Sequence, residues 1–477
     1  MTRILKLLTA LMLLPGAVIY AQESELPKSV DNSLLMYFPP VINQQGGSCA
    51  QASGIGYMFT YEINRLLGRD AKASSDNRFA YLFTWNFVNE GGDNGGFVDE
   101  GLGIAKNFGV MTERDFTYAY VYQYRWASGF EKYHNAARYR VKRINKFDCT
   151  TDDELTIIKR YLYDHGDGSS TGGLVTFSTE SSDWKINNYY EGPSLTGYKS
   201  MLTALATQGA HALTIAGYDD TVEYVDNDGQ IHLGAFIVVN TWGTWWADNG
   251  RFYLPYYFFT HRKGFWDQTL STTMQGCDVY VHEPKIMFKL QLDYTSRNDL
   301  RLTYGAATVP YALSPQNWYN SIILYNQGGD HPMRGSVSSD DASQLEVGID
   351  YSDHIADNEA VYGKYFFNVV RGSYGTKLGE GTIDYLSVID YRSDQPVEYV
   401  CRGIAGTPLK TGSNQFVISG LYPGHFSASP VAVKVSATGQ PDPTTTYIVR
   451  TANGRFAKMQ LTGNAENVQM KYTILKK

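Results

Sequence analysis

Hydrophobic residues between positions 50 and 67 recur at steps of three and four, the spacing that lines one face of an α-helix. Ile55 and Phe59 belong to this series, and Gly68 follows it as a typical stop signal. A second helix is predicted after Thr151, because acidic residues occupy its first turn ahead of spaced leucine and isoleucine residues. We expect the first helix to be mostly buried.

Short apolar runs after the second helix predict strands. The sequence Asp-Asn-Asp-Gly at residues 226–229 is typical of a hairpin turn between two of these strands. A few helices followed by strands indicate an α+β unit that ends near residue 283. The predicted strands of this unit cover residues 173–178, 213–218 and 235–240.

From Lys285 onward, apolar residues alternate with other residues at period two, the pattern of a strand. Ile286 and Phe288 begin the first such run, and no convincing helix follows it. The remainder of the chain is therefore predicted to be all β. We expect an α+β domain over residues 22–283, a β-sandwich domain over residues 284–402 and a small all-β domain over residues 403–477.

The first 21 residues predict a secretory signal peptide. Arg3 and Lys6 form its positive start, residues 7–14 its apolar stretch and residues 19–21 its cleavage site. The apolar stretch is too short to span a bilayer comfortably, and no later segment is long and apolar enough to do so. We therefore expect a secreted or periplasmic protein without a membrane span.

Composition and charge exclude several classes of protein. Of 477 residues, 43% are hydrophobic and 19% charged, which is typical of a globular chain. The net charge of −7 and the absence of a lysine or arginine run argue against a nucleic-acid partner. With four cysteines, a disulfide-dense scaffold is excluded, although Cys149 and Cys277 could form one bridge in an oxidising compartment.

Metal sites are not predicted either. No complete zinc or EF-hand spacing is present. Acidic runs such as residues 350–353 could bind calcium, but they are more typical of solvated loops. We expect no metal and no cofactor, and the sequence leaves the oligomeric state open.

The candidate nucleophile is Cys49, which lies directly before the first predicted helix. A thiol at a helix N-terminus lies at the positive end of the helix dipole, and this position favours the nucleophilic thiolate. The glycines before it allow a tight turn, and the amide of an upstream glutamine can point at an oxyanion that forms beside the sulfur. A cysteine in this position is more often structural than catalytic, so the interpretation depends on its partners.

Two downstream residues complete a catalytic set. His211 begins a predicted strand and is the candidate general base. Asn240 ends another strand, and its side-chain oxygen could hold the imidazole in the useful tautomer, with Trp242 covering that hydrogen bond from water. Each residue alone has a structural explanation, but their order and local context together favour catalysis.

At these residues the chain resembles the papain-like cysteine proteases. Residues 26–31 resemble the start of the mature domain of that family, Asn-Gly-Gly at residues 94–96 its substrate-binding turn, and Asn-Thr-Trp-Gly at residues 240–243 its Asn-Ser-Trp-Gly signature. The resemblance covers residues 26–283 and implies an α+β fold with a helical lobe and a β-barrel-like lobe. It also implies that Gly95, Gly96 and Trp242 contact a peptide or protein substrate.

The chain departs from the family pattern near the nucleophile. Ala50 replaces the tryptophan that normally follows it. By strict count from Cys49, the glutamine that the family uses at the oxyanion site falls on Asn43. By the Val-x-Asn-Gln pattern it falls on Gln44, and Gln45 is a third candidate. We favour Gln44.

Two further departures concern crosslinks and length. Gly46 and Asp93 occupy positions where the family often has a cysteine pair, so one disulfide is absent. His211 and Asn240 follow Cys49 by 162 and 191 residues, more than the usual ~130–150. We therefore expect insertions around residues 181–200 and 226–232.

The resemblance predicts an exported cysteine peptidase that works through a Cys-His-Asn triad and an acyl-enzyme. Only residues 22–48 separate the predicted signal cleavage from the nucleophile, so no classical N-terminal inhibitory segment is expected. The alternative is a catalytically silent papain-like scaffold that serves as a secreted or surface binding or adhesion protein. Residues 289–302 faintly resemble the jelly-roll P-domain of some secreted proteases, and this β region could restrain the enzyme or simply pack against it.

Overall fold

The computed structural model describes residues 25–117, 124–188, 194–262, 269–308, 312–335, 342–355, 363–375 and 378–419, and the backbone of three strands within residues 446–474. The expected signal peptide, residues 1–21, lies outside the described residues. No helix in the described part of the chain is both long and apolar enough to cross a membrane.

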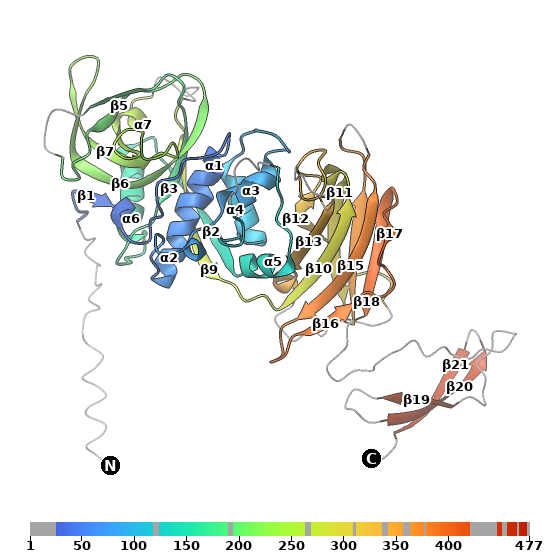
Figure 1. Ribbon diagram of the computed structural model, residues 1–477. Helices are drawn as coiled ribbons and strands as arrows, with labels where there is room; N and C mark the ends of the chain where they lie inside the picture. The colour runs from blue at the N-terminus through green and yellow to red at the C-terminus, as the bar shows by residue number, and fades with distance from the viewer. Residues whose placement is uncertain are drawn as a thin grey trace, which may run out of the picture.

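A helical lobe surrounds one continuous central helix (Figure 1). α1 (Cys49–Gln51), a wider π-type segment (Ala52–Phe59) and α2 (Thr60–Leu67) follow one another without a break. Gly68, with φ of 62°, ends the helix, so the first helix is confirmed, including its stop signal. Every side chain from residue 50 to 64 is buried. The other helices of this lobe are α3 (Tyr81–Val88), α4 (Val98–Asn107) and α5 (Phe130–Ala137).

The second lobe is built on a nine-stranded sheet with the order β2-β9-β3-β6-β7-β8-β5-β4, in which β1 also pairs with β6. The predicted hairpin is confirmed as β6 (Ala210–Val225) followed by β7 (Ile231–Val239). The second predicted helix is confirmed as α6 (Asp152–Asp164), capped by the Thr151 side chain. The remaining elements are β1 (Ser29–Asp31), β2 (Tyr139–Asp148), β3 (Val175–Glu180), β4 (Lys185–Asn188), β5 (Ser200–Ala204), β8 (Arg251–Pro255), α7 (Tyr257–Thr260) and β9 (Thr273–Val281).

Two antiparallel sheets follow and pack face to face. One has the order β13-β10-β15-β16 with β17 on β15, and the other has the order β12-β11-β14-β18. Phe288 and Phe367, from opposite sheets, have ring centroids 5.3 Å apart in the shared core. The predicted β character of this region is therefore confirmed. The strands are β10 (Ile286–Tyr294), β11 (Leu300–Ala307), β12 (Tyr319–Tyr325), β13 (Gln344–Asp350), β14 (Lys364–Arg371), β15 (Gly381–Asp390), β16 (Val397–Val400), β17 (Thr407–Pro408) and β18 (Gly412–Ser419).

The strand β18 lies beyond the expected domain boundary at residue 402. It pairs with β14 from Gly412 opposite Arg371 to Ser419 opposite Lys364. Because this pairing adds a full strand to the second sheet, we propose that the sandwich domain extends to Ser419. A separate three-stranded sheet comprises β19 (Thr446–Arg450), β20 (Phe456–Asn464) and β21 (Asn467–Ile474).

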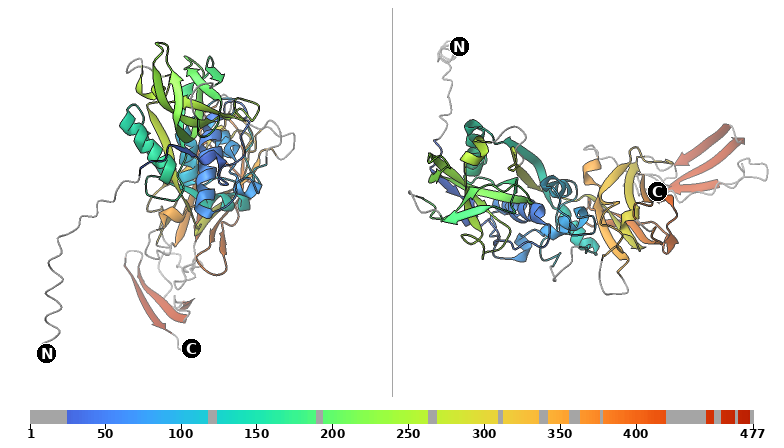
Figure 2. Two further views of the ribbon diagram at one scale, coloured as in Figure 1. Left: turned by 90° about the vertical axis from the view of Figure 1, so that its left-hand side faces the viewer. Right: turned by 90° about the horizontal axis from the view of Figure 1, so that it is seen from above.

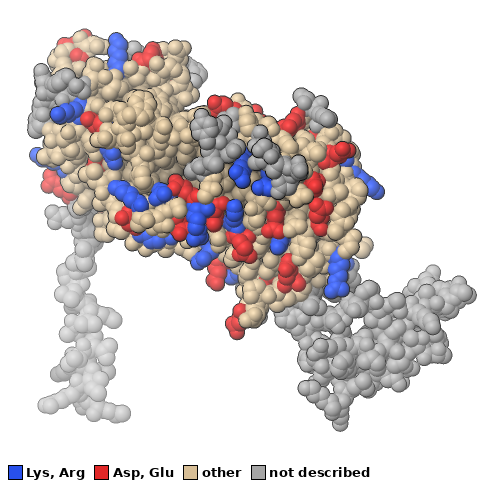
Figure 3. All heavy atoms as spheres, viewed as in Figure 1, with Lys and Arg blue, Asp and Glu red and all other residues tan. Residues whose placement is uncertain are grey.

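The helical lobe lies between the sandwich and the part of the nine-stranded sheet that contains β5, β6 and β7, whereas β2 and β9 run beside the helices (Figures 1 and 2). The helical lobe and the sandwich share one hydrophobic core. On the face drawn in Figure 3, charged residues of both signs gather over the helical lobe and the sandwich, whereas the β lobe presents mostly uncharged residues. Because of this shared core, the sandwich packs directly on the α+β unit.

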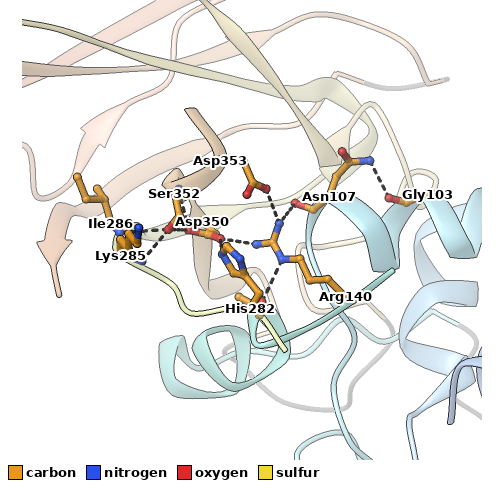
Figure 4. A network of polar contacts seen from close by, with 10 residues as sticks. Gly103, Asn107, Arg140, His282, Lys285, Ile286, Asp350, Ser352 and Asp353 are labelled. Atoms are coloured by element: carbon orange, nitrogen blue, oxygen red, sulfur yellow. Dashed lines mark hydrogen bonds and ion pairs between the residues drawn. The ribbon is translucent and has the colours of Figure 1, made fainter. Parts of the chain in front are cut away.

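A buried ion pair joins the two units (Figure 4). Arg140 at the start of β2 is fully buried and donates to Asp350 at the end of β13 and, at 2.8 Å, to the more exposed Asp353. His282 Nε2 lies 2.7 Å from Asp350 Oδ2. Although burial acts to raise it, the pKa of Asp350 is held below its ordinary value by His282 and Arg140. The interpretation of residues 350–353 as a solvated loop is therefore wrong, since Asp350 neutralises a buried arginine.

The four cysteines are free, so the bridge that Cys149 and Cys277 could have formed is absent. Cys277 on β9 lies opposite Ile144 of β2, while Cys149 comes five residues after Ile144 and donates its backbone N–H to Thr272. Five residues of strand span about 16 Å. A disulfide requires Cα atoms within roughly 7 Å of each other, so the ladder register keeps the two thiols apart.

Candidate active site

Cys49 opens the central helix at the junction of the two lobes. It is half-buried at the first position of α1, as predicted. The backbone N–H of Ala212, the third residue of β6, interacts with its thiol, and the Ser53 hydroxyl donates to the Ala212 carbonyl at 2.9 Å. The central helix is therefore fastened to the strand that carries His211.

His211 and Asn240 lie together in the interior of the β lobe. His211 Nε2 is 2.8 Å from Asn240 Oδ1, and the two residues are 5% and 0% exposed. Because Asn240 Oδ1 accepts a hydrogen bond, the proton of a neutral imidazole is held on Nε2 and Nδ1 is left as the basic nitrogen. The β6–β7 ladder places these residues side by side, since both lie at the same end of neighbouring strands.

Tryptophan side chains enclose the imidazole. Trp242 stacks on His211, with ring centroids 4.7 Å apart and planes 20° apart. Trp184 lies edge-on to the same imidazole at 6.0 Å and 5.8 Å from the Trp242 ring. Trp242 thus occupies the covering position that the sequence suggested. Trp184 was missed because it lies 27 residues upstream, in a segment interpreted only as an insertion.

Burial controls the protonation of the candidate pair. Burial raises the pKa of the Cys49 thiol, and it outweighs the backbone N–H groups of Ala212, Ala50 and Cys49, which act in the opposite direction. Burial lowers the pKa of His211 to about 4, against the opposing effect of its hydrogen bond to Asn240. Burial therefore acts against the helix N-terminus, which was expected to favour the thiolate. No hydrogen bond joins Cys49 and His211 among the described contacts.

The loop before Cys49 places Gln44 at the end of β7. The Gln44 backbone N–H donates to the Thr241 carbonyl at 2.7 Å, and its side-chain oxygen accepts from the Thr241 hydroxyl. Its Nε2 donates to the Gly46 carbonyl at 2.7 Å. Asn43 instead pairs with Trp242 through a backbone bridge, and Gln45 is exposed. Of the three candidates, Gln44 is the one whose side chain is anchored beside Asn240.

Tyr57 is a further residue that sequence reasoning missed. Its hydroxyl donates to the Asn240 carbonyl at 2.9 Å and accepts the Ile42 backbone N–H at 2.7 Å. One buried side chain of the central helix thereby connects the loop of Gln44 with the strand end of Asn240. Tyr57 lies within the predicted helix but was not singled out there, so the sequence offered no signal for its polar role.

The turn with Gly95 and Gly96 lies against the loop of Cys49. A Cβ atom on Gly47 would be 3.1 Å from the backbone nitrogen of Gly95. Asp93 Oδ1 accepts the Gly47 N–H at 2.7 Å, and a Cβ on Gly46 would lie only 2.1 Å from that oxygen. The Asp93 carboxylate therefore crosslinks the two loops where the resemblance would place a disulfide.

A cavity of about 430 Å³ lies beside the same loop, on the side of the helical lobe. It is lined by Asn43, Gln45 and Tyr81 but by neither Cys49 nor His211, so it is separate from the candidate catalytic residues. Within the described residues, no three His, Cys, Asp or Glu side chains are grouped to hold a metal ion.

Comparisons with known proteins point to one family. A family model described as papain family cysteine protease matches residues 26–257, which covers the helical lobe and most of the nine-stranded sheet. No curated protein matches. Xylellain, a cysteine protease from Xylella fastidiosa, is 16% identical with a TM-score of 0.36 over 54% of this chain and 88% of its own. The bromelain protease from Ananas comosus, in complex with the E64 inhibitor, is 15% identical with a TM-score of 0.35 over 53% of this chain and 99% of its own.

Proposed function

Because residues 26–257 belong to the papain family of cysteine proteases, we propose that this chain hydrolyses peptide bonds with Cys49 as nucleophile, His211 as general base and Asn240 as the residue that orients His211. The hydrogen bond between His211 and Asn240, stacked under Trp242 beside the helix that carries Cys49, is the observation that carries the proposal. It combines a base in a defined tautomer with a nucleophile on the neighbouring helix.

In the proposed first step, proton transfer accompanies the attack by Cys49. As the Cys49 sulfur attacks the carbonyl carbon of a peptide bond, its proton passes to His211 Nδ1, and the carbonyl oxygen becomes an oxyanion. Collapse of the tetrahedral intermediate expels the amine, which takes the proton from His211 and leaves a thioester on Cys49. A water molecule, deprotonated by His211, then attacks the thioester and releases the acid and the free thiol.

The oxyanion is stabilised by the Cys49 backbone N–H and the Gln44 side-chain amide. The NH₂ group of Gln44 has two donors, and the contact with Gly46 uses only one of them. The Thr241 hydroxyl donates to the oxygen of the same Gln44 amide. This second contact limits the rotation of the amide. Gly95 and Gly96 contact the substrate backbone, because residues without side chains allow a peptide to approach closely.

We also propose that residues 1–21 direct export and are removed, giving a secreted or periplasmic enzyme whose substrates are peptides or proteins. N-terminal sequencing of the exported protein tests this assignment. A mature chain that still carries Met1 would contradict it.

A peptide-library cleavage profile of the mature protein tests the catalytic proposal. Cys49→Ala should abolish cleavage, while Cys401→Ala, which removes a half-exposed thiol of the sandwich, should leave it unchanged. Undiminished cleavage by Cys49→Ala would contradict the proposal. A wild-type protein that cleaves no peptide yet retains a peptide-binding cleft would instead favour the silent binding scaffold.

A further inference from the structure

The sandwich contacts the backbone just before the substrate-binding turn. Its loop at residues 326–331, which we term the clamp loop, packs on the backbone of Glu90 and Gly91. His331 Nε2 lies 2.9 Å from the Gly91 carbonyl oxygen, which can only accept, so the imidazole is the donor. A Cβ atom on Gly91 would lie 2.4 Å from the Gly328 carbonyl oxygen, so the two backbones are in contact.

The backbone under the clamp loop is strained. Glu90 has φ of 54°, a conformation that residues with a side chain rarely adopt, and Gly91 has φ of 72°. Such strain persists only where surrounding contacts hold it. The sandwich supplies part of these contacts, since Gly329 also lies against the Glu90 carbonyl. The Asn89 side chain supplies another by accepting the Gly91 N–H at 3.0 Å.

The clamped backbone leads into the candidate substrate site within a few residues. Gly92 closes a turn by donating to the Asn89 carbonyl at 3.0 Å, and Asp93 follows with its bond to the Cys49 loop. Trp85 Nε1 donates to the Asn94 carbonyl at 2.9 Å. Gly95 and Gly96 therefore lie on a short segment that is held by the sandwich at one end and by the helical lobe at the other.

A buried arginine supports the clamp loop from below. Arg297 is fully buried, donates through Nε to the Gly328 carbonyl at 2.8 Å and through its backbone N–H to the His331 carbonyl at 2.9 Å. Its guanidinium lies 4.2 Å from the centroid of the Trp126 ring, and Trp126 in turn donates to the Asn86 carbonyl of α3 at 2.8 Å. The clamp loop is thus rigidly joined to the helix that precedes the substrate-binding turn.

We propose that His331 is a positioning residue of the peptidase: through its hydrogen bond to Gly91 it holds Gly95 and Gly96 in the geometry that binds the substrate backbone, so that the C-terminal sandwich is part of the substrate-binding apparatus. The inference rests on the proposed function for the role of the two glycines. It assigns the sandwich a supporting role in binding, in place of the restraint that the sequence left open.

His331 matters for substrate binding because its hydrogen bond restricts the conformational entropy of the glycine-rich turn. A turn with four glycines at positions 91, 92, 95 and 96 has a wide range of backbone conformations when it is released. Loss of the His331 donor leaves the Gly91 carbonyl without this partner and lets the turn leave its binding geometry. Substrate affinity should then fall, whereas the reactivity of the Cys49 thiol should not.

The test compares three variants of the full chain: His331→Ala, His331→Gln and His282→Ala. Glutamine retains an N–H donor near the position of Nε2. His282 is the control, because its imidazole also makes a contact with the sandwich, here to the Asp350 carboxylate, away from the turn. For each variant we would measure KI and kinact for the E-64 inhibitor, the rate of alkylation by iodoacetamide at pH 8.5, and amide hydrogen exchange over residues 89–97.

We expect His331→Ala to raise KI about five- to tenfold, the effect of one neutral hydrogen bond, with kinact and the alkylation rate unchanged and exchange over residues 89–97 faster. His331→Gln should restore most of the affinity, and His282→Ala should lower thermal stability without changing KI. Wild-type KI and exchange in His331→Ala, or an equal rise of KI in His282→Ala, would overturn the inference. If E-64 fails to modify Cys49 in the wild type, the proposed function fails, and the exchange measurement alone decides whether His331 positions the turn.

Discussion

The hydroxyl group of Tyr57 donates a hydrogen bond to the backbone carbonyl of Asn240, 183 residues away along the chain. The same oxygen accepts the N–H of Ile42, so one side chain of the central helix connects the candidate oxyanion loop to the strand end that orients His211. This buried hydroxyl therefore adds to the contacts of Gln44 with Thr241 and of Ser53 with Ala212 in aligning the candidate site.

Replacing Tyr57 by Phe should remove this connection. The Asn240 carbonyl and the Ile42 N–H would lose a buried partner, and we expect a loss of about 2 kcal/mol in the free energy of unfolding and a fall of about tenfold in kcat/KM. Denaturant titration and steady-state kinetics measure both quantities.

Tyr61 provides the matched control for this variant. It is also fully buried in the central helix and donates to a backbone carbonyl, that of Gly172, at 2.8 Å. Tyr61→Phe should lose stability but keep kcat/KM. An equal loss of activity in both variants would show that the effect of Tyr57 is global destabilisation.

The raised pKa of Cys49 predicts the pH dependence of its alkylation. The thiolate is the reactive form, so the rate with iodoacetamide should be low at pH 6 and rise continuously towards alkaline pH. Mass spectrometry of the modified protein, with Cys49→Ala as background, measures the rate at this thiol. A high rate that is constant from pH 5 to 8 would instead show that a thiolate–imidazolium pair forms.

The lowered pKa of His211 predicts a pH dependence of stability. The group has a pKa of about 4 in the folded chain and about 6.5 when unfolded, so the unfolded chain binds more protons between these values. The neutral imidazole contributes about 3 kcal/mol to the free energy of unfolding above pH 6.5. This contribution is lost as the pH falls from 6.5 to 4. Unfolding titrations of wild type and His211→Asn should differ in slope over this window. If the free energies of unfolding of wild type and His211→Asn changed in parallel with pH, His211 would not be a buried neutral histidine.

The inter-unit ion pair predicts a strong dependence of folding on Arg140. Arg140→Ala leaves the buried carboxylate of Asp350 without its guanidinium, and we expect a loss of about 3 kcal/mol or more. Asp353→Asn is the control, because that carboxylate is 52% exposed and its pair with Arg140 should contribute less than about 1 kcal/mol. Similar losses in the two variants would contradict the buried role of Asp350.

Truncation after Glu283 should fail to yield a folded enzyme. The helical lobe and the sandwich share a hydrophobic core, so removal of the sandwich exposes apolar surface and leaves Arg140 without Asp350. We expect an aggregated product by light scattering and no gain of peptidase activity. A soluble truncated chain with increased activity would support restraint by the sandwich.

The sequence by itself determined the local features of this protein. Helical spacing located the central helix and its end at Gly68, and alternation identified the first sandwich strand. Short motifs selected Cys49, His211 and Asn240, because these signals depend on neighbouring residues. Only the tertiary structure decided what depends on residues distant in the chain. The pKa values of Cys49 and His211 follow from burial, the separation of Cys149 and Cys277 from strand register, and the contacts of Tyr57, Trp184 and His331 from the packing of segments that no local pattern connects. The composition of a segment determines its own conformation, whereas solvation and long-range contact arise only when the units pack together.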